Sequence, residues 1–206
     1  MLPVWICGKS DTVRKDVSLT SLIVAQQRTV GNYCGLNRDG HAYYFCSFTM
    51  LLYAAIFHVY RIVFEGTLFG KYQCTATSLM RIGYLSTRTQ FIDNCVENAD
   101  IDQFVVLGAG MDTRCHRLKL PDNCKCFEVD APITQLHKRT VISSHMKKYK
   151  INIDNEQKNG KSSSYLSNTN VNYVSVNFNE GEDLFKRLVE EGFDCALKTL
   201  FIIEGV

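Results

Sequence analysis

Residues 103–114 have the sequence QFVVLGAGMDTR, in which an apolar run leads into a glycine-rich turn. The run over residues 104–107 is rich in β-branched side chains and predicts a buried parallel strand. Gly108 and Gly110 flank Ala109 directly after it, and glycine there allows a tight turn and the close approach of a ligand. The stretch therefore predicts a strand that ends in a ligand-binding turn.

A second predicted strand, KCFEVD over residues 125–130, ends in an acid. Asp130 lies 20 positions after Gly110, a spacing that suits a carboxylate bound to the two hydroxyls of a ribose. The third glycine of a dinucleotide fingerprint is absent, because Thr113 stands at its place. The two strands therefore predict a nucleoside cofactor without a pyrophosphate, bound at the carboxyl ends of a parallel sheet.

Strand and helix patterns alternate through the second half of the chain, which predicts an α/β fold with a parallel sheet. The predicted strands cover residues 104–107, 125–130, 172–178 and 199–203. The predicted helices cover residues 75–99, 133–149 and 183–191, with Pro132 in a first turn and Gly192 after a last one. Residues 150–170 are polar and predict a surface loop.

The first 74 residues predict a separate helical extension ahead of a domain over residues 75–206. Within the extension, residues 18–30 predict an amphipathic helix and residues 31–40 a loop. Residues 42–60 contain no Asp, Glu, Lys or Arg, and this run is long enough to cross a bilayer. Its tyrosines, serine, threonine and histidine weigh against insertion. A soluble or lid-forming helix and a membrane or membrane-surface segment both remain open.

Bulk composition indicates a protein of a reducing compartment. The nine cysteines are odd in number and follow no disulfide framework, which favours the cytoplasm, with membrane association through residues 42–60 as the alternative. The net charge of +2 gives no basic footprint, so nucleic acid is not an expected partner. Cys124 and Cys126 lack the spacing and the histidine partners of a metal site, and no metal is expected.

Further candidate residues follow from their positions. Glu204 repeats the pattern of Asp130, because it follows the fourth predicted strand. Asp112 either contacts the ligand or caps the helix that begins near Thr113. Arg88 and Arg81 lie on the helix before the first strand, where either could clamp a ligand carboxylate or remain a solvated surface charge.

Four blocks in this order resemble the leucine carboxyl methyltransferase family, a group of class I S-adenosylmethionine-dependent methyltransferases. They are RTQFID at residues 88–93, LGAGMDTRCHRL at 107–118, FEVDAP at 127–132 with Lys138 downstream, and TLFIIEGV at 199–206. The resemblance implies a Rossmann-like sheet with strand order 3-2-1-4 and S-adenosyl-L-methionine as cofactor. It also implies O-methylation of a carboxylate or hydroxyl, on a small molecule or on the C-terminal carboxylate of a protein.

The resemblance also implies roles for the candidate residues. Gly108, Ala109 and Gly110 would pass under the methionine part of the cofactor, and Asp130 would hold the ribose. The methionine carboxylate would be neutralised by an arginine, Arg88 or Arg81. Glu204 would face the cofactor from the fourth strand.

Two departures from the family pattern stand out. Asn177 and Phe178 replace an Asp-Leu pair after the third strand; Asn accepts a hydrogen bond without charge, which predicts weaker cofactor binding that rises on Asn177→Asp. The later strands of the family are missing, so a C-terminally truncated domain is expected. The alternative function is a catalytically inactive cofactor-binding or regulatory fragment. No catalytic residue is predicted, because a carboxylate acceptor needs no general base.

Overall fold

The computed structural model describes residues 19–48, 50–52, 55–56, 59, 63, 76–121, 123–157 and 171–204. The chain divides into two compact units, Met1–Ile92 and Asp93–Val206. The division falls inside helix α5 (Ala76–Glu97), which agrees with the helix predicted over residues 75–99. The domain boundary expected at residues 74 and 75 lies outside the described residues.

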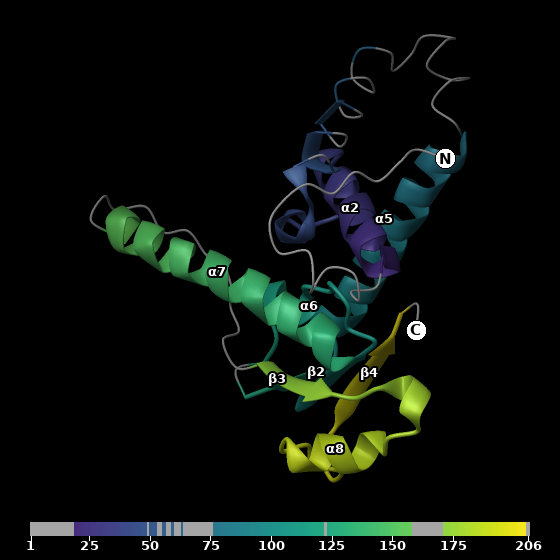
Figure 1. Cartoon of the computed structure of the whole chain (residues 1–206), viewed down its shortest axis with the longest axis vertical. Coiled ribbons are helices and arrows are strands. Elements are labelled where there is room, and N and C mark those ends of the chain that lie inside the picture. The colour runs from purple at the N-terminus through teal and green to yellow at the C-terminus, as the bar shows by residue number, and fades with distance from the viewer. Residues whose placement is uncertain are drawn as a thin grey trace. The chain divides into compact units, whose positions relative to one another are not determined.

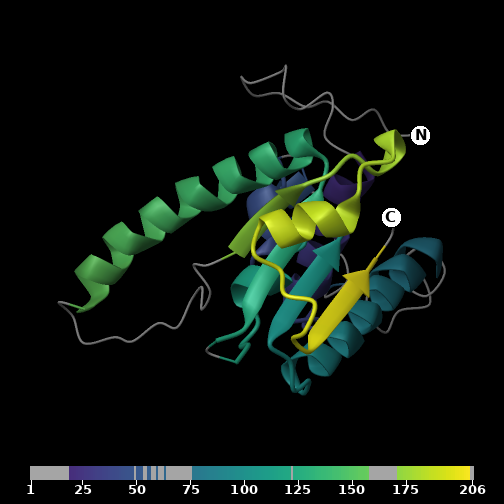
Figure 2. The same ribbon diagram turned by 90° about the horizontal axis from the view of Figure 1, so that it is seen from below.

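The second unit contains a four-stranded parallel sheet (Figures 1 and 2). Its strands are β1 (Gln103–Leu107), β2 (Lys125–Asp130), β3 (Val171–Ser175) and β4 (Thr199–Ile203). They lie in the order β3-β2-β1-β4, which confirms the predicted α/β class and strand order. Because all four strands are parallel, their carboxyl ends lie at one edge, which is called the carboxyl edge below.

Among the described residues, three α-helices lie between the strands, and local sequence explains where two of them begin. They are α6 (Arg114–Arg117), α7 (Pro132–Gln157) and α8 (Leu184–Glu190). Pro132 begins α7, where its missing N–H costs nothing. The Asp183 carboxylate accepts the Lys186 N–H at 3.1 Å and caps α8. Gly192, with φ of 90°, follows the end of α8 as predicted.

Two predicted boundaries are wrong. Helix α7 continues to Gln157, so residues 150–157 are helical rather than loop, because no glycine or proline interrupts the sequence there. Strand β3 ends at Ser175 rather than residue 178. The Asn177 N–H donates to Glu182 at 3.1 Å instead of continuing the ladder, since its neighbour β2 ends at Asp130. The rest of the predicted loop, residues 158–170, lies outside the described residues.

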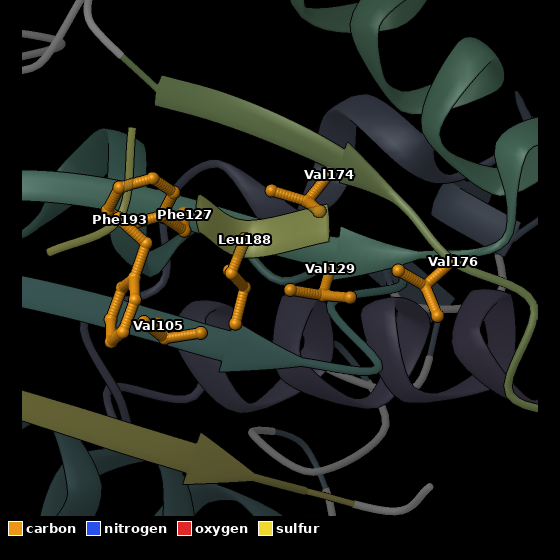
Figure 3. Close-up of a cluster of buried hydrophobic side chains, with 7 residues drawn as sticks. All are labelled: Val105, Phe127, Val129, Val174, Val176, Leu188 and Phe193. Atoms are coloured by element: carbon orange, nitrogen blue, oxygen red, sulfur yellow. The ribbon is translucent and has the colours of Figure 1, made fainter. Parts of the chain in front are cut away.

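Strand β2 directs its large apolar side chains to one face of the sheet and the Glu128 carboxylate to the other. Its Phe127 and Val129 belong to a buried cluster with side chains from β1, β3 and the α8 region (Figure 3). The other members are Val105, Val174, Val176, Leu188 and Phe193. Side chains alternate along a strand, so Cys126, Glu128 and Asp130 point to the opposite face. Helix α7 covers that face, because Lys138 from α7 contacts Glu128 at 2.7 Å.

The first unit contains helix α2 (Leu19–Tyr33), which confirms the predicted helix and extends it by three residues into the predicted loop. α2 packs closely on α5 at Gly31. A Cβ atom there would lie 2.1 Å from Ser86 Oγ and 2.4 Å from Asn37 Nδ2, so only glycine fits. Asn37 is buried and donates to both the Arg28 carbonyl and Ser86 Oγ at 3.1 Å.

Residues 42–60 do not form the single helix expected from their apolar run. A 3-10 helix, η1 (Ala42–Phe45), begins where the Asp39 carboxylate accepts the Ala42 N–H, and it ends at Cys46, whose backbone is extended. The described residues from 48 to 59 are again helical. Within the described ranges of the chain, helices of the length and apolar character needed to span a bilayer are absent.

Candidate cofactor site

The glycine turn lies directly after β1, as predicted. Gly108 and Gly110 have φ values of 62° and 43°, in the left-handed region that favours glycine. The Asp112 N–H donates to the Ala109 carbonyl at 2.7 Å and closes the turn. The Ala109 N–H donates to the Val129 carbonyl at 3.0 Å, which ties the turn to β2. The turn is therefore held against the end of the neighbouring strand.

Asp130, the last residue of β2, contacts this turn. Its Oδ2 accepts the Gly110 N–H at 2.6 Å, and its Oδ1 accepts the Ala131 N–H at 2.7 Å. Each carboxylate oxygen keeps a further lone pair that can accept a hydroxyl. The structure thus brings together the two residues whose 20-position spacing suggested a ribose site.

Next to the turn, Arg114 contacts three carboxylates from three segments. Its Nε donates to Asp93 of α5 at 2.9 Å, and its Nη1 donates to both Asp112 and Glu204 at 2.5 Å. Arg117 clasps the same Asp93 through Nη1 at 2.7 Å and Nη2 at 2.8 Å. These five side chains, at most 8% exposed, are called the Arg114 cluster.

The Arg114 cluster carries an excess of negative charge. Burial acts to lower the pKa of Arg114, but Asp112, Glu204 and Asp93 outweigh it and raise that pKa above its usual range. Two guanidinium groups facing three carboxylates leave one negative charge. Arg114 Nη2 is buried and has no hydrogen-bond partner among the described residues, so an acceptor there would stabilise the cluster.

The structure bears on one of the two roles considered for Asp112, while its contact with a ligand stays a prediction. Its Oδ1 accepts the Arg114 N–H at 2.8 Å at the start of α6, which is a capping contact, while its Oδ2 binds the Arg114 guanidinium. Glu204 follows β4 at the carboxyl edge, as predicted, with Oε2 on Arg114. The interpretation of the sequence missed the arginine that joins them. Three basic residues in the four-residue α6 were the available signal.

A second buried ionic group lies on the face of β2 to which Glu128 points. Glu128 contacts Lys138 at 2.7 Å and His116 at 3.6 Å, and His116 shares a hydrogen bond with the Tyr173 hydroxyl at 3.2 Å. Burial raises the pKa of Glu128 to about 7, although Lys138 acts in the other direction. These four residues are called the Glu128 cluster. In the sequence its signals were an acid inside an apolar strand and Lys138 downstream of the third block.

Asn177 and Phe178 follow β3 at the carboxyl edge. Asn177 Nδ2 donates to Glu180 Oε1 at 2.7 Å, so the amide is oriented by an acidic neighbour. Phe178 begins the 3-10 helix η2 (Phe178–Glu180) and is 42% exposed. Contact of these two residues with an adenine stays a prediction.

The two candidate arginines of α5 both belong to the first unit. Arg88 lies over the ring of Tyr84, with Cζ 5.5 Å from the ring centroid. The side chain of Arg81 lies outside the described residues. The choice between them as partner of a ligand carboxylate stays a prediction.

Three cysteines lie in or near β2 and α6. Cys126 and Cys115 are buried, Cys124 is partly buried, and all three are free thiols. Burial raises the pKa of Cys115, which favours the neutral thiol. In the described part of the chain, His, Cys, Asp and Glu side chains do not gather in a group of three that could hold a metal ion.

Comparison with known proteins places this chain in a family. Residues 63–206 match the model of leucine carboxyl methyltransferase. The chain belongs to this family. It is also similar to proteins that carry the name "Putative S-adenosyl-L-methionine-dependent methyltransferase". The relative from Mycolicibacterium smegmatis is 30% identical over 126 residues, and the one from Mycobacterium avium is 28% identical over 130 residues.

These similarities cover the larger part of this chain but a smaller part of the relatives. The alignments include 60% and 62% of the chain, but only 33% and 35% of the two relatives. A further relative from Streptomyces coelicolor is 29% identical over 58% of the chain and 36% of its own length. These three alignments therefore span about a third of the length of each relative.

Proposed function

We propose that this chain carries the cofactor-binding part of an S-adenosyl-L-methionine-dependent methyltransferase that methylates a carboxylate or hydroxyl oxygen. The observation that carries the proposal is the contact between Gly110 and Asp130 at the carboxyl edge. It joins a tight glycine turn to a carboxylate with spare acceptor capacity, which is the arrangement a nucleoside requires. Family membership and the names of the relatives support this proposal.

The residues of the carboxyl edge fit the parts of this cofactor. Asp130 would accept the two ribose hydroxyls, and the turn over residues 108–110 would lie under the methionine part. Asn177 and Phe178 would contact the adenine, through the amide oxygen and the exposed ring. The orphaned Arg114 Nη2 and the spare lone pairs of Asp130 are polar groups that a ligand could satisfy.

Charge favours the same ligand. When bound, the cofactor supplies a methyl group on a positively charged sulfonium. The negative charge of the Arg114 cluster, together with Asp130, attracts a cation to this edge. An arginine of α5, Arg88 or Arg81, would neutralise the carboxylate of the methionine part. Glu204 would face the cofactor from the end of β4.

A general base is not assigned to any residue. An acceptor carboxylate is already an anion at neutral pH, so alignment and removal of water supply the acceleration. The acceptor would be a small molecule or the C-terminal carboxylate of a protein. A carboxylate acceptor predicts a transfer rate that is flat between about pH 6 and 9, because its pKa of roughly 4 lies below that window. A hydroxyl acceptor predicts a rate that rises with pH.

Calorimetric titration with S-adenosylmethionine and S-adenosylhomocysteine tests the binding step. We expect the native chain to bind both, and Asp130→Asn to weaken binding by at least about tenfold, because the amide keeps only one acceptor oxygen. Asp194→Asn is the matched control. The Asp194 carboxylate also accepts a backbone N–H, from Ala196 at 2.9 Å, but it precedes β4 at the opposite edge. Absence of binding by the native chain would overturn the proposal.

Transfer of a labelled methyl group separates an enzyme from a cofactor-binding protein. The assay offers peptides with a free C-terminal carboxylate, the same peptides amidated, and small hydroxyl and carboxyl compounds. Base-labile label on the free peptides alone would identify a carboxylate acceptor. Cofactor binding without transfer to any compound would contradict the enzymatic part of the proposal and leave binding as the function.

A further inference from the structure

One nitrogen of Arg114 joins two segments that border the proposed cofactor site. Nη1 donates at 2.5 Å both to Asp112, two residues after Gly110, and to Glu204, one residue after β4. Both segments lie at the carboxyl edge, where Asp130 contacts the glycine turn. The guanidinium therefore connects the end of β4 to the turn after β1.

Without this guanidinium the two carboxylates would separate. Asp112 and Glu204 share one nitrogen, so their oxygens lie close together and would repel each other across a dry interior. The Arg114 backbone N–H also binds Asp112, at 2.8 Å, so the side chain and the turn form one unit. Nε holds Asp93 at 2.9 Å, which orients the plane of the guanidinium.

Stability alone does not explain the buried charges of the Arg114 cluster. Buried ion pairs are often replaced by apolar residues without loss of stability, because removing charges from water offsets their attraction. Here the cluster keeps a net negative charge and an Nη2 group without a partner among the described residues. The Arg114 guanidinium is held in place at the carboxyl edge and still has N–H donors on Nη2 that pair with no described residue. These two properties fit a residue that supports a ligand site better than one that only fills the core.

We propose that Arg114 is a positioning residue of the cofactor site, which holds Glu204 and the glycine turn in the arrangement that binds S-adenosylmethionine. The inference rests on the proposed function. It assigns to Arg114 an effect that is transmitted through Glu204 and Asp112. Because Arg114 acts through Glu204, removing either residue should remove largely the same contribution to binding.

A double-mutant cycle on the dissociation constant of S-adenosylmethionine tests this coupling. The variants are Arg114→Met, Glu204→Gln and the two combined, measured by calorimetry at a temperature where circular dichroism shows each to be folded. We expect each single change to weaken binding by about tenfold or more. The dissociation constant of the double variant should be about equal to that of the weaker-binding single variant. Independent effects would instead multiply the two fold-losses of affinity.

A matched control separates positioning from general loss of stability. Leu188→Ala opens a cavity in the apolar cluster on the other face of the sheet and should lower stability while leaving the dissociation constant unchanged. If Arg114→Met does not fold, Arg114→Lys replaces it in the cycle, since one ammonium cannot reproduce the planar contacts with Asp93, Asp112 and Glu204. We expect Arg114→Lys to bind with intermediate affinity.

The outcomes separate the inference from the proposed function. Native affinity in Arg114→Met or Arg114→Lys, or losses that multiply in the double variant, would overturn the positioning role while cofactor binding stands. A native chain that binds neither S-adenosylmethionine nor S-adenosylhomocysteine would overturn both. A native dissociation constant in Leu188→Ala together with coupled losses in the cycle is the result that the inference requires.

Discussion

The Arg114 cluster and the Glu128 cluster are two buried ionic groups with different connections. The Arg114 cluster joins α5, the glycine turn, α6 and the end of β4, so it binds together segments that meet at the carboxyl edge. The Glu128 cluster joins β2 to α6, α7 and β3, and Glu128 lies two residues before the end of β2. The segments that each cluster connects therefore suggest different roles, a ligand site for the Arg114 cluster and helix packing for the Glu128 cluster.

The largest expected effect is on the Arg114 cluster. Asp93→Ala leaves two buried guanidinium groups without their shared carboxylate, and we expect a loss of about 3–5 kcal/mol in the free energy of unfolding. Urea denaturation followed by circular dichroism measures it. A loss below about 1 kcal/mol is typical of surface ion pairs. That result would show that the cluster is solvated and contributes no more than an exposed pair.

Replacing the Glu128 cluster tests whether it is only structural. Lys138→Met alone should be destabilising at pH 8, where Glu128 would otherwise be ionised, because the buried carboxylate then loses its counter-ion. Adding Glu128→Leu should recover most of that loss, since apolar side chains can replace a buried pair. Cofactor affinity in the double variant should equal the native value. A double variant that is stable but does not bind the cofactor would show that the Glu128 cluster also supports the cofactor site.

The pH dependence of stability tests the protonation of Glu128 in the Glu128 cluster. The folded-state pKa of Glu128, about 7, lies above its ordinary value of 4.5, so the folded state holds a proton in this window that the unfolded chain has released. The Glu128 contribution to stability is therefore fully present below pH 4.5 and is lost as pH rises through 7. Glu128→Gln removes this dependence.

The check is the difference in unfolding free energy between the native chain and Glu128→Gln at pH 5, 6, 7 and 8. That difference should shift against the native chain by on the order of 1–3 kcal/mol as pH rises. A difference that stays constant over the window would show that Glu128 is ionised throughout. Asp100→Asn, a change at an exposed ion pair with Lys198, provides the control.

Sequence patterns were sufficient for the sheet and for one half of the site. Alternating strand and helix periods predict the parallel sheet, and the family resemblance implies its strand order. The spacing of Gly110 and Asp130 follows from the length of one strand–helix–strand unit. The Arg114 cluster could not be predicted, because Arg114 meets partners 21 and 90 positions away that only the folded sheet brings together. The end of β3 depended on Glu182, a side-chain acceptor that periodicity does not detect.

A smaller effect is expected at the glycine turn. Gly110→Ala places a Cβ on a residue with φ of 43°, which should cost about 1 kcal/mol in unfolding free energy through backbone strain. Cofactor affinity should fall more than stability does, because the turn borders the ligand. Differential scanning calorimetry and titration of the same sample measure both quantities. If Gly110→Ala lowers stability but binds the cofactor with native affinity, the turn does not contact the cofactor.

The smallest expected effect is at Asn177. Aspartate there would gain charge toward an adenine amino group, but it would lose the 2.7 Å hydrogen bond to Glu180 and face that carboxylate. We therefore expect Asn177→Asp alone to change affinity by less than about threefold, and the same change with Glu180→Gln to raise it further. Calorimetric titration compares the two variants. A full gain in Asn177→Asp alone would show that Glu180 does not orient the amide.

Amide NMR tests the central claim most directly, because Gly110 and Ala131 donate their N–H groups to the Asp130 carboxylate. Two-dimensional ¹H–¹⁵N spectra of the native chain are recorded as S-adenosylmethionine is added. The amide signals of Gly108, Gly110 and Ala131 should shift most as the carboxylate accepts ribose hydroxyls, while that of Leu188 in the apolar cluster stays in place. Unchanged signals at the turn under saturating cofactor, or shifts confined to other residues, would contradict a cofactor site at this edge.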